Sequence, residues 1–264
     1  MPRGTYPNTA PTRGTYDWLK LRVGLYLRSE LSSPDLGTDC NYNTWDNYQL
    51  GIVDEMIQSG LFQFYYPPST GQKVPYEWSF LKPEATIATL NNDFDYDLPS
   101  DFGGIVQDFT YTTADAVRKP KLVSPEDIMA HRGNVAAVTG PPKYIAIRPK
   151  TSTGSAAQGF EAIVYPTPVT GSLPTLRYRY LVVPALMTSS ATYPLGALSH
   201  AETIAASCLA TAEVYWKGTM GPMRQYFMER LRASIAIDMR GNALSSGDIV
   251  DMLDLKQSGV GAGG

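Results

Sequence analysis

Residues 199–241 read SHAETIAASCLATAEVYWKGTMGPMRQYFMERLRASIAIDMRG, a stretch that predicts two helices joined by a tight turn. Ser199 and Glu202 have the spacing of a capping box, in which the glutamate reaches back to the amide of the capping serine. Behind this cap, apolar residues recur at a period of 3.6, at Ile204, Cys208, Leu209, Ala212, Tyr215 and Trp216. Gly218–Gly221 predicts the turn, and Pro222 suits the first position of the second helix.

The second helix has apolar residues four apart, at Phe227, Leu231, Ile235 and Met239, and Gly241 ends it. Two amphipathic helices with so short a connection predict an antiparallel hairpin. The chain has only two cysteines, Cys40 and Cys208, far apart in the sequence. They provide neither a disulfide framework nor a metal-ligand spacing, so we expect no metal and no cofactor.

The N-terminal part of the chain also has helical signals. Thr15 can cap a first helix, and Asn43 or Thr44 can cap a second. We expect the second helix to stop at Gly60. The aromatic run over residues 62–66 precedes two prolines, which disfavour helix before them, so this run is expected to be extended.

Between Pro75 and Pro184 the pattern changes to short β-rich runs separated by Pro, Gly, Asn and Asp. The runs are Tyr76–Leu81, Ala85–Leu90, Gly104–Thr112, Tyr144–Arg148, Phe160–Tyr165 and Leu176–Val183. In the last run, Arg177 and Arg179 share one face and two tyrosines share the other, as in a half-buried strand. One helix interrupts the block, with Ser124 as its N-cap.

The fold class is therefore predicted to be α+β. We expect a helical bundle built from the N- and C-terminal helices, with an inserted antiparallel β-sheet or small β-sandwich. The predicted organisation has a flexible arm over 1–14, the bundle over 15–73 and 190–243, the insert over 74–189, and a C-terminal tail over 244–264.

Composition limits the classes of partner. The net charge is −3, and no run of Lys and Arg exceeds two residues, so general affinity for DNA is not expected. Only 18% of residues are charged while 17 are tyrosines, a balance that suits permanent protein contacts. No apolar run has the length of a membrane span, and no signal-peptide core is present, so we expect no membrane association and a cytoplasmic origin.

A search for chemistry finds no catalytic constellation. His131 and His200 are the only histidines, and neither has a partner at a metal spacing. The acidic cluster over residues 93–97 fits a turn followed by an exposed strand face, with an ion site and a catalytic pair as weaker alternatives. Trp45, Trp78 and Trp216 fit a core or an interface better than a sugar platform, and we expect no enzyme.

The order and spacing of several motifs carry a resemblance. They are Gly60–Pro68, Trp78–Leu81, Tyr96–Gly104, the strand from Arg177 to Pro184 and the capped helix from Ser199. Together they resemble proteins encoded beside phage head and tail genes. The helices–sheet–helices layout is similar to that of the head-to-tail adaptor family of tailed bacteriophages, also described as neck, head-completion or tail tubular proteins.

This resemblance implies a virion structural protein of the neck or tail, assembled in the host cytoplasm. It implies a ring of about twelve copies that docks beneath the portal and continues the DNA channel. DNA is then only passing cargo, and tail, nozzle or fibre proteins are further partners. It implies no catalytic residues.

Two sets of candidate contact residues follow. A short apolar stretch between flexible residues cannot fold alone and can order on a partner, so we expect portal docking by Ile249, Val250, Leu253 and Leu255. Inter-subunit or tail-facing contacts are expected at Tyr65, Tyr66, Arg177 and Arg179. Alternatives are another neck, tail-completion or hub protein of the virion and, in a different class, a carbohydrate-binding module.

Overall fold

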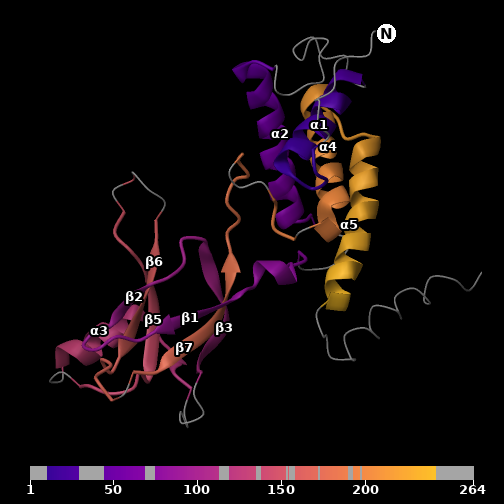
Figure 1. Cartoon of the computed structure of the whole chain (residues 1–264). Coiled ribbons are helices and arrows are strands. Elements are labelled where there is room, and N and C mark those ends of the chain that lie inside the picture. Colours follow the sequence, from indigo (N-terminus) through magenta and orange to yellow (C-terminus); the bar gives the residue numbers. More distant parts are fainter. Residues whose placement is uncertain are drawn as a thin grey trace, which may run out of the picture. The chain divides into compact units, whose positions relative to one another are not determined.

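The computed structural model describes residues 11–29, 45–68, 75–112, 119–134, 138–152, 154, 158–171, 173–189, 193–196 and 198–241. Over this part of the chain it is an α+β protein with five α-helices and two β-sheets (Figure 1). The chain divides into two compact units. The helical unit comprises Met1–Ser79 with Leu186–Gly264, and the β unit comprises Phe80–Ala185.

The helical unit is arranged around one central helix. Its helices are α1 (Tyr16–Ser29), α2 (Asn47–Tyr65), α4 (Ala201–Lys217) and α5 (Pro222–Gly241), with a 3-10 turn, Leu198–His200, before α4. Helix α4 contacts α1, α2 and α5, and nearly every side chain in its first three turns is buried. This burial explains why the sequence of α4 is apolar almost all round.

Helices α4 and α5 run antiparallel, as the hairpin pattern predicted. Hydroxyl groups of Thr203 and Ser234 lie 2.6 Å apart, and at the other end the Met223 amide donates to the Glu213 carboxylate at 3.0 Å. The turn between the helices begins at Gly218, which has a left-handed conformation that glycine adopts without steric cost. The apolar residues spaced by four on α5 face inward, with Phe227, Leu231 and Ile235 buried.

The predicted course of the second helix was wrong at both ends. Its N-cap is Asp46, which forms a capping box with Gln49. The helix passes through Gly60 and ends at Tyr65, so most of the run expected to be extended is helical. Gly60 is the point where α2 and α4 touch, since a Cβ there would lie 2.5 Å from the Cα of Cys208. From the sequence alone, a glycine that permits close packing of two helices looks the same as a glycine that ends a helix.

The predicted capping box of α4 was also wrong. His200 occupies the N-cap position without a side-chain capping bond, and the Ser199 hydroxyl donates to the Gly196 carbonyl instead. The carboxylate of Glu202 forms ion pairs with Arg13 and Arg22 at 3.1 and 3.2 Å. A tertiary contact with α1 therefore replaces the local one, while the predicted cap of α1 is confirmed by the Trp18 amide, which donates to Thr15 Oγ1.

The β unit contains two sheets. Strands β1 (Glu84–Ala88), β7 (Thr175–Val182) and β3 (Phe102–Tyr111) form an antiparallel sheet in that order. The second sheet has the order β2 (Asp95–Asp97), β6 (Phe160–Tyr165), β5 (Tyr144–Pro149) and β4 (Lys121–Leu122). Its pair β4–β5 is parallel, so the predicted antiparallel arrangement holds for the first sheet and for the pairs β2–β6 and β5–β6 but not for β4.

Five of the six predicted strand runs correspond to β1, β3, β5, β6 and β7, with small shifts at their ends. The first run, Tyr76–Leu81, is not a strand but ends in a 3-10 turn, Ser79–Leu81. The two short strands β2 and β4 were not predicted, because two or three residues carry too little periodicity.

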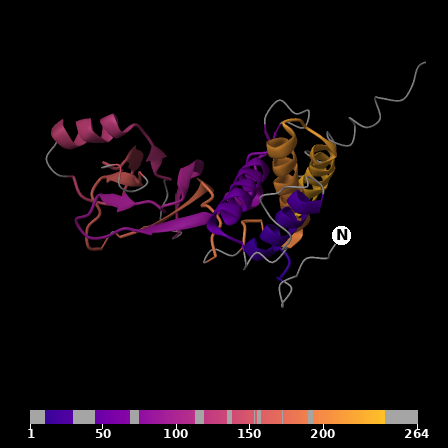
Figure 2. The same cartoon turned by 90° about the horizontal axis from the view of Figure 1, so that it is seen from above.

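Helix α3 (Pro125–Asn134) joins the parallel strands β4 and β5 and packs on the second sheet; Figure 2 shows it on one side of the strands. The predicted cap is confirmed, since the Asp127 amide donates to Ser124 Oγ at 3.2 Å. Ile128 buries itself against Ala146 and Ile163. In β7 the predicted alternation is confirmed, because Tyr178 and Tyr180 are buried while the arginines face outward.

Candidate interaction surfaces

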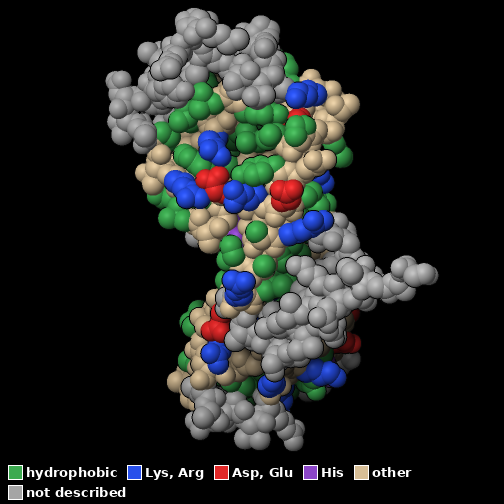
Figure 3. Space-filling view, turned by 90° about the vertical axis from the view of Figure 1, so that its right-hand side faces the viewer, with side chains coloured by type: hydrophobic (Ala, Val, Ile, Leu, Met, Phe, Trp, Pro, Cys, Tyr) green, Lys and Arg blue, Asp and Glu red, His purple; other side chains and the backbone are tan. Residues whose placement is uncertain are grey.

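A groove of about 510 Å³ lies on the helical unit between the C-terminal half of α2 and the end of α4. Its walls are largely apolar and exposed, with Phe62 at 65%, Tyr215 at 54% and Met220 at 73% exposure. Large hydrophobic side chains so exposed and so close together indicate an interaction site. Figure 3 shows one face of this unit in its upper half, where hydrophobic side chains lie among Lys and Arg side chains.

The groove exists because two helices end or turn beside each other. On α2, Leu61, Phe64 and Tyr65 fill the core, so Phe62 must point outward on the opposite face. On α4 the buried run ends at Glu213, and the last turn extends beyond the packed region. The predicted inward stripe of α4 is therefore wrong at its end, because Tyr215 faces solvent.

Hydrogen bonds hold the two walls of the groove together. Gln63 of α2 accepts from the Thr211 and Ser207 hydroxyls of α4 at 3.3 and 3.4 Å. The Ser207 hydroxyl is also 2.7 Å from the Gly60 carbonyl, to which it donates. Since these polar contacts, one of them buried, link the two helices, they hold the walls of the groove in place.

Among the described residues that line the groove, Arg224 is the only charged one. Its guanidinium lies 5.7 Å from the ring centre of Phe227 and, within the described part of the chain, forms no ion pair. The nearby Lys217 is already paired with Glu213 at 3.5 Å. The groove therefore offers apolar area together with one cation that has no carboxylate partner among the residues that the structure describes.

The two predicted tyrosine contacts have different environments. Tyr65 is only 6% exposed, and its hydroxyl accepts a hydrogen bond from the Leu195 amide at 2.9 Å. Burial raises the pKa of Tyr65 to about 12. Tyr65 thus stabilises its own unit and is not available as a surface contact, whereas Tyr66 is exposed and its ring centre lies 4.7 Å from that of Phe62.

The two predicted arginine contacts lie on the outer face of β7. Arg177 is exposed and lies 3.6 Å from Glu84 of the neighbouring strand. Arg179 donates twice to the Lys82 carbonyl, from Nε at 3.2 Å and from Nη2 at 3.0 Å. A shallow hollow of about 230 Å³ beside them is also lined by Gln107 and Asp108. Arg179 therefore fixes a loop of its own unit, and Arg177 remains the more accessible of the two.

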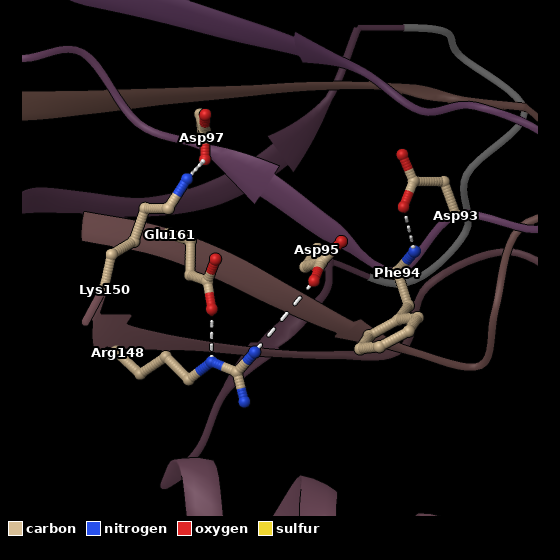
Figure 4. Close-up of polar contacts among 7 residues, drawn as sticks. All are labelled: Asp93, Phe94, Asp95, Asp97, Arg148, Lys150 and Glu161. Carbon is tan, nitrogen blue, oxygen red and sulfur yellow. Dashed lines mark hydrogen bonds and ion pairs between the residues drawn. The ribbon is translucent and has the colours of Figure 1, made fainter. Parts of the chain in front are cut away.

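Two aspartates of the acidic cluster, Asp95 and Asp97, lie in a row of ion pairs on the second sheet, while Asp93 accepts a hydrogen bond from the Phe94 amide at 2.8 Å (Figure 4). Asp97 pairs with Lys150 at 2.6 Å, while Arg148 lies 2.5 Å from Glu161 and 4.0 Å from Asp95. Each of these carboxylates thus has a cation beside it. The arrangement matches the predicted turn and strand face, and in the described residues no group of three or more His, Cys, Asp or Glu side chains could hold a metal ion.

The two histidines and Cys208 make packing contacts in the described part of the chain. His131 stacks on both Tyr144 and Tyr165, with ring centres 5.7 and 5.5 Å away. His200 is buried against Trp78, so it is not a surface residue, and burial lowers its pKa. The Cys208 thiol is fully buried, which raises its pKa to about 12 and keeps it from acting as a nucleophile.

The three tryptophans considered for sugar binding are buried or half-buried. Trp45 and Trp78 are buried, and Trp78 donates to the Phe64 carbonyl at 2.8 Å. Trp216 is half-buried, and an edge-on ring contact links it to Tyr215. A flat exposed tryptophan face, which sugar binding requires, is thus not formed by these three residues. No helix among those described combines the length and apolar character needed to cross a bilayer.

Both units, together with the groove and the ion-pair row, fall within a single match to a known family. Residues 15–249 match the SU10 adaptor protein family. The chain belongs to this family. A search of curated proteins found no match. The family is one of phage head-to-tail adaptors, which confirms the predicted resemblance.

As a phage adaptor, the protein is a structural component of the virion and contacts other phage capsid or tail proteins. The adaptor family is structural and not enzymatic. The candidate portal-docking residues Ile249, Val250, Leu253 and Leu255 lie outside the described residues, as do most of the predicted arm and the tail. Their roles stay predictions.

Proposed function

We propose that the adaptor assembles into a ring between portal and tail and that this ring continues the DNA channel. The match to the adaptor family over residues 15–249 carries the proposal, because it includes both compact units. A closed ring needs two different patches on each copy, repeated around an axis. The groove on the helical unit and the outer face of β7 are two such patches of different character.

Within this ring, helices α1, α2, α4 and α5 act as a bundle, and the β unit is an insert that meets a neighbouring protein. The two chain segments that lead to and from the insert support this division. Asp238 of α5 accepts from the Tyr76 hydroxyl at 2.7 Å and from the Ser79 amide at 2.9 Å. Gln58 of α2 exchanges two hydrogen bonds with the Met187 backbone. Both segments are thus anchored on the helical unit.

The negative net charge of the chain is compatible with a channel through which DNA passes. The net charge is −3, so a ring of about twelve copies is an acidic assembly that does not retain the phosphate backbone. DNA is therefore cargo and not a ligand. We further propose that the chain folds in the host cytoplasm before it joins the particle.

The portal contact is proposed at the C-terminal residues 249–255. Truncation after Leu244 removes this stretch, and we expect binding to purified portal to be lost. Truncation after Lys256 is the matched control, because it removes only the glycine-rich end and should bind like the full chain. Full portal affinity after removal of residues 245–264 would show that the contact lies elsewhere.

Location in a purified particle tests the whole proposal. A cryo-electron microscopy map should show the adaptor as a ring at the junction of head and tail, with a copy number near twelve. A position lower in the tail would instead favour a tail-completion or hub protein. Density outside the neck and tail would contradict the proposal.

A further inference from the structure

The groove between α2 and α4 has apolar side chains and a cation that no described residue covers or pairs with. Its apolar side chains Phe62, Val214, Tyr215 and Met220 are exposed to solvent. Arg224 adds a cation that has no carboxylate partner within the described residues. An occupant that satisfies both must be apolar on one side and acidic on the other.

One segment of the chain outside the described residues has this pattern. Residues 248–255 read DIVDMLDL. At helical spacing, the three aspartates share one face, and Ile249, Val250 and Leu253 share the opposite face. A short helix in a hydrophobic groove, with charges at its edge, is a recurrent mode of peptide recognition.

The distance from the end of α5 argues against docking within one chain. Arg224 lies 17 residues before Gly241 on α5, which corresponds to about 25 Å along the helix axis. The seven residues from Gly241 to Asp248 span at most about 25 Å when fully extended. Docking on the same copy would stretch the connection completely with Asp248 beside Arg224 and would leave only about 5 Å of slack with Asp251 there, whereas docking on another copy has no such limit.

We propose that residues 248–255 of one adaptor copy occupy the groove of another copy. Ile249, Val250 and Leu253 cover the apolar walls, and an aspartate pairs with Arg224. The inference goes beyond the proposed ring, because it describes a contact between copies before they meet the portal. Since the same residues are the proposed portal contact, the portal and the groove compete for this segment.

Disulfide trapping between two full-length copies tests this contact. Both copies carry Cys40→Ser, while the native Cys208 thiol is buried and does not compete. One copy carries Val214→Cys in the groove, and a differently tagged copy carries Leu253→Cys. On mild oxidation of the mixture we expect a mixed disulfide dimer, and added portal should reduce its yield.

A matched control replaces the groove cysteine with Tyr48→Cys, which is exposed on the first turn of α2 and away from the groove lining. It should give several-fold less mixed dimer. Arg224→Glu should lower the yield several-fold, and Asp251→Arg in the partner should restore it.

Equal yields of mixed dimer with the cysteine at position 214 and at position 48 would overturn the proposal. So would a single copy that carries both Val214→Cys and Leu253→Cys and forms its disulfide mainly within one chain. A segment that docks only on the portal would give the first of these results. Failure here is distinct from failure of the proposed function, because the ring in the particle is seen directly in the map.

Discussion

Gly60 determines how closely α2 approaches α4. The Cβ of any other residue at this position would lie 2.5 Å from the Cα of Cys208 and 2.7 Å from its amide nitrogen. Backbone atoms in the middle of a packed helix cannot move aside cheaply, so the clash must shift the two helices apart. The same α2 helix contains Gly51, where a Cβ would meet nothing within 4 Å.

We predict that Gly60→Ala destabilises the helical unit by about 1–3 kcal/mol through overpacking. Gly51→Ala should instead stabilise it by up to about 1 kcal/mol, because alanine loses less backbone entropy in a helix. Denaturant unfolding of the two variants measures the difference. Equal stability of the two would show that α4 can move away without cost.

A second residue prediction concerns His200. Burial lowers the pKa of His200 below its ordinary value of 6.5, and the carboxylate of Asp238 opposes this to a smaller extent. The unfolded chain therefore binds a proton more readily than the folded one. The folded state is therefore most stable, as far as His200 is concerned, above pH 6.5, where this histidine is neutral in both states. That stability is lost as the pH falls from 6.5 toward the lower pKa that His200 has in the folded state.

The expected result is a smaller free energy of unfolding at about pH 5 than at about pH 7. His200→Phe keeps an aromatic ring beside Trp78 and removes the titrating group, so its stability should change less over this interval. Unfolding curves at several pH values for both proteins provide the measurement. If the free energy of unfolding of the variant falls with pH as steeply as that of the unmodified protein, the pH dependence comes from other groups.

Among the elements, α5 has a structural role beyond its apolar face. Its buried Asp238 accepts from Tyr76, from the Ser79 amide and from the Ser79 hydroxyl, which lies 2.5 Å away. Desolvation and the hydrogen bond to Asp238 together raise the pKa of Tyr76. One carboxylate thus anchors the segment that precedes the β unit.

We predict that Asp238→Ala destabilises the helical unit by about 2–3 kcal/mol, since hydrogen bonds to a buried charged group are lost and their donors stay unpaired. Hydrogen exchange at the Ser79 amide should become faster. Glu229→Ala on the exposed face of the same helix should change stability by less than about 0.5 kcal/mol. Unchanged protection of Ser79 in the Asp238 variant would mean that the segment is held by other contacts.

For the whole molecule, two aspartates of the acidic cluster form ion pairs within the β unit. Asp95 and Asp97 both lie beside cations of strand β5 and the loop after it. We predict that the double variant Asp95→Asn, Asp97→Asn is incorporated into particles in normal amount and that these particles stay infectious. Protein composition and infectivity of purified particles are the measurements. Normal composition combined with lost infectivity would reveal a function that the ion pairs do not explain.

Much of the fold followed from local patterns in the sequence. The spacing of four from Phe227 identified the buried face of α5, and alternation around Tyr178 identified the inward side of β7. The caps at Thr15 and Ser124 were also predicted correctly. In each case the signal and its structural consequence lie within one element, where periodicity and backbone hydrogen bonds act.

The interaction surface was not predictable in this way. Phe62 was expected in an extended run and Tyr215 on a buried stripe, yet the two share one exposed groove. The order and spacing of several motifs indicated an adaptor. No sequence pattern, however, placed Phe62 and Tyr215 together or singled out Arg224.

The amino-acid sequence by itself thus determined the α+β class, most helices and strands, and the absence of any recognisable catalytic motif. Only the tertiary structure decided that Gly60 is a contact between helices, that Glu202 binds arginines, and that α2 and α4 leave a groove. The physical reason is that burial depends on what packs against a residue, and that partner lies about 150 positions away for Gly60 and Cys208.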